Sequence, residues 1–172
     1  MNSVDLQTSL DAEKKAVSNA AKAKTYTVDI APLNGSGVSG TAELTLMGDQ
    51  LTVRVYATGL EPDMLHPQHI HGFTENNRNS TCPPASADMN GDGLVDLGEG
   101  LPFYGPVLLP LTPFPTAPDG TIDFEMTYTV DSSITPLQNR VIVLHGMTVE
   151  GEYVATLPVA CGQIKASQGR NN

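Results

Sequence analysis

The 172-residue chain lacks several features, and each absence excludes a class of protein. It has no tryptophan, and none of its apolar runs approaches the ~20 residues that a membrane-spanning helix needs. The first twenty residues lack the apolar core of a secretory signal, so we expect that any signal has been removed or never existed. The length suits one ordinary domain with a single core.

Basic residues are also scarce. Nine Lys and Arg stand against 19 Asp and Glu, which gives a formal net charge of −10. Residues 25–164 hold only Arg54, Arg78 and Arg140 against sixteen carboxylates, a net charge of −13. Because such a body repels phosphate groups, we expect neither nucleic acid nor an anionic membrane as a partner. Metal cations are the partners that this charge favours.

Only two cysteines occur, Cys82 and Cys161, seventy-nine positions apart. They are either free core residues or the two ends of one long-range disulfide, and a loop-rich chain without tryptophan favours the disulfide. A disulfide indicates an oxidising compartment. We therefore expect an extracellular, periplasmic or cell-surface protein.

Hydrophobic alternation with a period of two begins at Lys24 and predicts an antiparallel β-sandwich or barrel over residues 25–164. Strands are expected at 26–30, 38–47, 51–57, 67–72, 121–130, 140–145 and 153–164, with a hairpin turn at 47–50. No helix is expected inside this domain. Six prolines in the second half of the insertion 83–118 argue against central strands there.

The two ends of the chain differ from this body. Residues 5–22, within an N-terminal segment of residues 1–24, predict a weak helix that is either a packing or linker helix or an oligomerising coil. Residues 165–172 predict a disordered tail.

Residues 88–99 match the twelve-residue calcium loop of EF-hands. Oxygen ligands at its positions 1, 3, 5, 7, 9 and 12 are predicted to come from Asp88, Asn90, Asp92, the backbone carbonyl of Leu94, Asp96 and Glu99. The alternative is an ordinary turn rich in Asp and Gly. Because no flanking helices are evident, we expect an isolated calcium loop that gives order to the insertion.

Three of the four histidines lie within six residues. On a strand, His69 and His71 project from the same face, so both rings can bind one metal ion. His145 ends the apolar run 141–144 and supplies a third imidazole, a set that suits copper or zinc. The alternative is that these are ordinary polar-face or core histidines. For His66 we expect a structural hydrogen bond instead of metal ligation.

In these motifs the chain resembles the Cu,Zn superoxide dismutase family over residues 25–82 and 119–164. His69-Ile-His71-Gly is similar to the strand that carries two copper ligands in that family, and the segment 140–145 is similar to the strand that ends in another. The segment 159–164 resembles the C-terminal strand with its disulfide cysteine. The resemblance implies an eight-stranded Greek-key barrel, a Cys82–Cys161 disulfide, and a catalytic copper ion bound by His69, His71 and His145.

The departures from the family pattern concern zinc and the substrate. No histidine lies between His71 and His145, so the bridging ligand and the zinc ligands are missing, and we expect no zinc. Position 158 is proline where the family has its substrate-guiding arginine. The stretch between His145 and Cys161 is too short for the usual electrostatic loop.

Three functions are consistent with these residues. The first is an exported copper-only superoxide dismutase that contains copper and calcium. The second is a copper-binding or copper-storage protein without enzymatic activity. The third is a structural extracellular module similar to the CHRD domain, which also carries an H-I-H-G strand.

Overall fold

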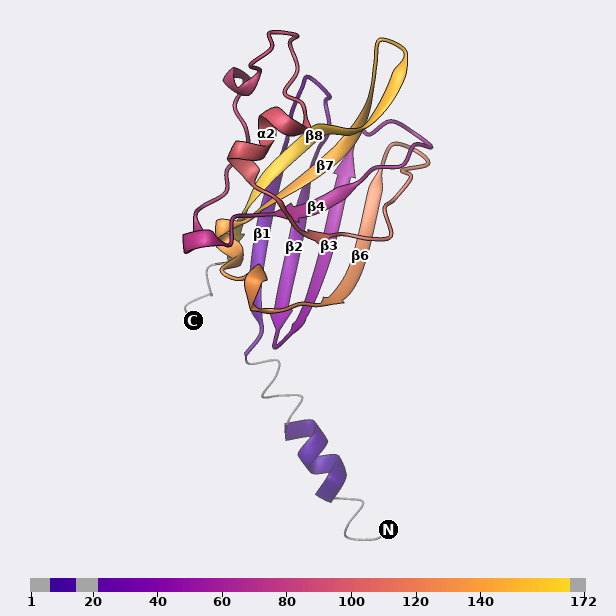
Figure 1. Ribbon diagram of the computed structural model, residues 1–172. Coiled ribbons are helices and arrows are strands. Elements are labelled where there is room, and N and C mark those ends of the chain that lie inside the picture. Colours follow the sequence, from indigo (N-terminus) through magenta and orange to yellow (C-terminus); the bar gives the residue numbers. More distant parts are fainter. Residues whose placement is uncertain (1–6, 15–21, 168–172) are drawn as a thin grey trace.

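The computed structural model describes residues 7–14 and 22–167, and its main body is a curled antiparallel sheet (Figure 1). Residues 7–14 are helical, as predicted, whereas residues 5–6 and 15–21 of the predicted N-terminal helix lie outside the described residues. Within the described ranges, no helix has the length and apolar character needed to cross a membrane.

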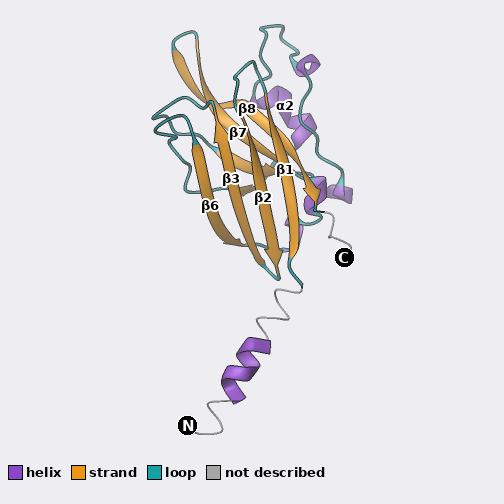
Figure 2. Ribbon diagram, turned by 180° about the vertical axis from the view of Figure 1, so that it is seen from behind, coloured by secondary structure: helices purple, strands orange, loops and turns teal. Residues whose placement is uncertain are grey.

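Eight strands form one sheet among the described residues, in the order β5-β4-β7-β8-β1-β2-β3-β6. Their bounds are β1 Lys24–Pro32, β2 Ser39–Met47, β3 Gln50–Thr58, β4 Gln68–His71, β5 Val107–Pro110, β6 Ile122–Thr129, β7 Val141–Val149 and β8 Glu152–Ala166. Figure 2 shows β1, β2, β3 and β6 side by side, with β7 and β8 curling behind them. The pairing of β3 with β6 and of β4 with β7 joins strands that are distant in sequence, as Greek-key connections do. The predicted all-β, barrel-like fold is confirmed.

The interior of the sheet follows the predicted alternation. In β3, the side chains of Leu51, Val53, Val55 and Ala57 are fully buried, whereas the residues between them are partly or fully exposed. Alternate residues of a strand point to opposite faces, so this pattern places one face of β3 in the core. Strand β1 repeats the pattern, and together these strands bury most of the apolar surface that stabilises the barrel.

Strand β7 is buried on both faces, and each face packs in a different apolar cluster. Ile142 and Leu144 belong to the main core inside the curled sheet. Val141 and Val143 lie on the opposite face, where they pack in a second, smaller cluster with Tyr104 and Cys161. The outer face of β7 is therefore covered by the long insertion instead of by solvent.

That insertion contains two elements that the sequence analysis missed. The helix α2 (Leu97–Tyr104) corrects the expectation of no helix inside the domain. Gly98, Gly100 and Pro102 are poor helix formers and conceal it in the sequence. Strand β5 lies at the edge of the sheet, where it pairs with β4, and an edge is where the flanking prolines allow a strand.

Shorter elements complete the chain. The 3₁₀-helices are η1 Glu75–Asn77, η2 Ala85–Ala87, η3 Ser132–Ile134 and η4 Leu137–Asn139. Strand β8 extends through Ala166, two residues into the predicted tail, because β1 offers hydrogen-bonding partners there. Residues 168–172 of that tail lie outside the described residues.

The predicted disulfide is present. Cys82 and Cys161 are bonded, with a distance of 5.8 Å between their Cα atoms. The bond joins the start of the insertion to the outer face of β8, beside the small cluster over β7. The sheet and the insertion are therefore covalently joined next to the candidate site.

Candidate metal centre

The three predicted ligands meet on the outer face of β4 and β7. His69 and His71 alternate with Gln68 and Ile70, which are fully buried on the other face of β4. His145 has the same parity in β7 as Val141 and Val143, so its ring also points outward. One ligand atom from each of the three histidines lies within 4.8 Å of the other two.

Backbone carbonyls fix the orientation of two of the rings. The Nδ1–H group of His71 donates to the carbonyl oxygen of Gly105 at 2.8 Å, and that of His145 donates to Thr156 at 2.9 Å. Each bond leaves Nε2 with a free lone pair, which is the arrangement found in histidines that bind metals. The Nδ1 atom of His69 lies 3.2 Å from Nε2 of His145 and completes the set of three donors.

Burial keeps these imidazoles neutral. Desolvation lowers the pKa of His71 to about 4 and that of His145 to about 3, although their hydrogen bonds to carbonyls act in the opposite direction. Desolvation also lowers the pKa of His69, which remains partly exposed. Neutral imidazole is the form that binds metal, so the cluster is ready for a cation at neutral pH without losing protons.

One nitrogen atom of the cluster is buried without a hydrogen bond. The Nε2 atom of His71 is buried and has no hydrogen-bond partner among residues 7–14 and 22–167. A buried polar atom without a partner costs about 1–3 kcal/mol, and a metal ion at the centre of the cluster would remove that cost. The donor set therefore fits a metal ion that accepts three nitrogen ligands.

Aromatic rings surround the centre. The ring of Phe114 lies edge-on to His69, with 5.4 Å between the ring centroids. The ring of Tyr104 lies 4.6 Å from that of His71. Sequence reasoning missed both rings, as well as the carbonyls of Gly105 and Thr156, because these groups come from the insertion and from β8 and belong to no recognisable ligand pattern.

His66 lies outside the metal cluster, as expected. Its ring is fully buried, with Nδ1 3.0 Å from the carbonyl oxygen of His145 and Nε2 2.8 Å from that of Glu61. It therefore holds the backbone that carries one ligand. The stretch between His145 and Cys161 forms the hairpin of β7 and β8, whose pairing is irregular on both sides of His145.

Most residues of the predicted calcium loop are exposed, whereas Val95 is buried, and the loop's side-chain oxygens accept bonds from its own backbone. Asp88 accepts from the N–H groups of Gly91 and Gly93, and Glu99 accepts from Met89, Asn90 and Asp96. Within the part of the chain that the structure describes, the three histidines are the one group of His, Cys, Asp and Glu side chains that converges as a metal site does. The carboxylates of the loop do not converge in this way.

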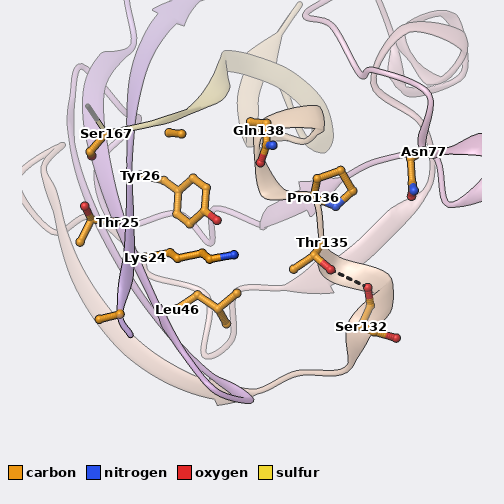
Figure 3. A pocket seen from close by; sticks show the side chains of 12 residues that line it. Lys24, Thr25, Tyr26, Leu46, Asn77, Ser132, Thr135, Pro136, Gln138 and Ser167 are labelled. Carbon is orange, nitrogen blue, oxygen red and sulfur yellow. Dashed lines mark hydrogen bonds between the residues drawn. The ribbon is translucent and has the colours of Figure 1, made fainter. Parts of the chain in front are cut away.

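A cavity outside the histidine cluster lies beside β1. It has a volume of about 780 Å³ and lies where β1 and β8 meet η4, with Lys24, Tyr26 and Gln138 around it (Figure 3). Ala23 and Ser167 also line it, and they are close in sequence to residues outside the described ranges. None of the three clustered histidines lines this cavity.

No protein-family model matches the chain, and no curated protein matches it either. The geometry of the histidine cluster and the fold therefore carry the functional argument.

Proposed function

We propose that the chain binds one copper ion through His69, His71 and His145 and dismutates superoxide at that ion. The observation that carries the proposal is the buried Nε2 atom of His71, which has no hydrogen-bond partner among the described residues and belongs to a cluster in which one nitrogen atom of each of three imidazoles lies within 4.8 Å of the others. The resemblance of the histidine motifs to Cu,Zn superoxide dismutases supports the same conclusion.

The donor set favours copper among the divalent metals. All three ligands are neutral imidazole nitrogens, and for such sites Cu²⁺ has the highest affinity in the first transition series. Bound copper would supply one-electron redox chemistry, alternately oxidising and reducing superoxide. The protein holds the imidazoles in place through the carbonyls of Gly105 and Thr156, and the partly exposed edge at His69 gives a small anion its approach.

The second candidate is copper binding without turnover, and the positions of the arginines favour it. Arg140 is fully buried and donates to the carbonyls of Phe73, Ser133, Ile134 and Thr135. Arg78 lies over the Phe73 ring and donates to the carbonyl of Pro102. Neither guanidinium is directed to the histidines by these contacts, and a net charge of −13 over residues 25–164 repels an anionic substrate.

Titration of the metal-free protein with Cu²⁺ against a competing chelator tests the copper site. We expect one equivalent to bind with nitrogen hyperfine structure in its electron paramagnetic resonance spectrum, and H71A or H145A to abolish that signal. The control is D119A, which changes an exposed side chain outside the cluster and should retain the signal. Failure of the unaltered protein to bind copper would favour a structural module.

A superoxide assay on the copper-loaded protein then separates the two copper functions. A dismutase should exceed free-copper controls in the presence of chelator. Its rate should rise with added salt, because salt screens the repulsion between the acidic body and the anion. Stoichiometric copper binding without dismutation above the free-copper controls would support the second candidate, copper binding without turnover.

We also propose that calcium binds the loop 88–99. One support is the spacing of the oxygen-bearing residues along the sequence. The other is α2, which begins at Leu97 and places Glu99 in its first turn, as the exit helix of a calcium loop does. The disulfide supports an oxidising compartment for the protein.

A further inference from the structure

We propose that α2 is a positioning element for the metal centre, so that the order of the acidic loop before the helix sets the metal affinity of the histidines after it. The inference rests on the proposed copper site and deepens it. It concerns Tyr104 and Gly105 as positioning residues that act through His71.

The C-terminal end of α2 determines how His71 is held. Gly105, the C-cap of the helix, accepts the Nδ1–H bond of His71, and this bond selects the tautomer whose Nε2 atom faces the other imidazoles. The ring of Tyr104 is fully buried and packs against that of His71. A shift of the last helical turn would therefore move both groups that orient this ligand.

The helix is weak by itself. It has only eight residues, and Gly98, Gly100 and Pro102 occupy its interior. Short helices with glycine and proline do not persist without outside support. At Gly100 a Cβ atom would collide with the ring of Tyr104, so glycine at this position makes room for the ring that packs on His71.

The acidic loop provides the support at the N-terminal end. Asp96 caps the helix by accepting from the N–H group of Glu99 at 2.9 Å, and the Glu99 carboxylate accepts in return from Asp96 at 3.0 Å. The other oxygen of Glu99 accepts from Met89 and Asn90 at the beginning of the loop. The folded loop and the first turn of α2 therefore share one carboxylate.

Two further sets of hydrogen bonds hold the helix and the loop in place. One joins the two ends of α2, and the other joins the loop to β8. The hydroxyl of Tyr104 donates to the carbonyl of Leu97 at 2.8 Å, which joins the last residue of the helix to the first. The side-chain amide of Asn34 bonds both backbone groups of Val95 and also donates to the carbonyl of Pro158. Pro158 lies opposite His145 in the pairing of β7 with β8, so the loop is tied to the strand pair that carries another ligand.

The test compares two variants and two matched controls, all in a calcium chelator so that no effect depends on calcium. D96A removes the helix cap, and Y104F removes the hydroxyl bond to Leu97. The control Y128F removes a similar bond, from Tyr128 to the carbonyl of Thr112 at 2.7 Å. The control D119A removes a carboxylate that accepts from the N–H group of Thr121 at 3.0 Å.

We expect D96A and Y104F each to weaken Cu²⁺ binding about 10-fold, the low end of the range for outer-shell partners of metal-binding histidines. In the metal-free protein, the ¹⁵N shifts of the His71 ring should change from one tautomer to a mixture. Both controls should match the unaltered protein in both measurements. Circular dichroism establishes that each variant is folded, and Y104F alone decides if D96A does not fold.

Unchanged copper affinity and unchanged His71 shifts in folded Y104F would overturn the inference. Equal losses in the controls would also overturn it, because they would indicate a general effect on stability. If the unaltered protein binds no copper, the proposed function fails by itself. The ring shifts of His71, measured without metal, would then still decide whether α2 positions this residue.

Discussion

Mild acid is predicted to destabilise the metal-free protein through two of its buried histidines. Burial lowers the pKa of His71 to about 4 and that of His145 to about 3, from 6.5 for an ordinary histidine. As the pH falls below 6.5, the unfolded chain therefore gains protons that the folded chain does not. Stability is complete above pH 6.5 and decreases as the pH falls toward the folded-state pKa values.

The size of the effect follows from linkage between proton binding and folding. At pH 5 each histidine is expected to cost about 2 kcal/mol of folding free energy, since one pKa unit corresponds to about 1.4 kcal/mol. Together His71 and His145 cost about 4 kcal/mol, a large part of the roughly 5–15 kcal/mol that stabilises a typical domain. The pKa of His69 is also lowered, so this residue acts in the same direction.

Urea unfolding at several pH values between 7.5 and 5, with a metal chelator present, measures this loss. Most carboxylates titrate near pH 4, so they contribute little within this window. The variant H71Q should lose about half of the pH dependence. Where that variant does not fold, NMR titration of the ring protons of His71 and His145 provides the second measurement. A constant free energy of unfolding between pH 7 and 5, or rings that titrate near pH 6.5, would refute the reasoning.

Two further predictions concern the calcium loop and the disulfide. Calcium should raise the melting temperature, and the double variant D88A/E99A should abolish the rise; an unchanged midpoint in the unaltered protein would refute the calcium assignment. Reduction of the Cys82–Cys161 disulfide, or its replacement by two serines, should lower the free energy of unfolding by about 4.5 kcal/mol, from the chain entropy of a loop with a sequence separation of 79. Urea unfolding of the oxidised and reduced protein checks this value, and equal midpoints would contradict it.

Where one face of a strand is buried, the sequence was sufficient to predict the fold. The alternation in Leu51–Ala57 specifies which face of β3 enters the core, and the same rule places His69 and His71 together on the outer face of β4. The insertion could not be predicted in this way. Its helix contains Gly98, Gly100 and Pro102 and is held by a cap and a tyrosine, so propensity argues against a helix that tertiary contacts stabilise.

For the candidate site, too, one part could be predicted from the sequence and another could not. The three candidate ligands could be predicted from residue type and spacing, because only histidine offers a neutral nitrogen at those positions. Their orientation depends on the carbonyl groups of Gly105 and Thr156, which any residue would supply, so no pattern of side chains could indicate them. What selects these carbonyls is the path of the backbone, and that path depends on α2 and on the pairing of β7 with β8. Variants that move the backbone without changing a ligand, such as those in α2, therefore address the part of the site that the sequence leaves open.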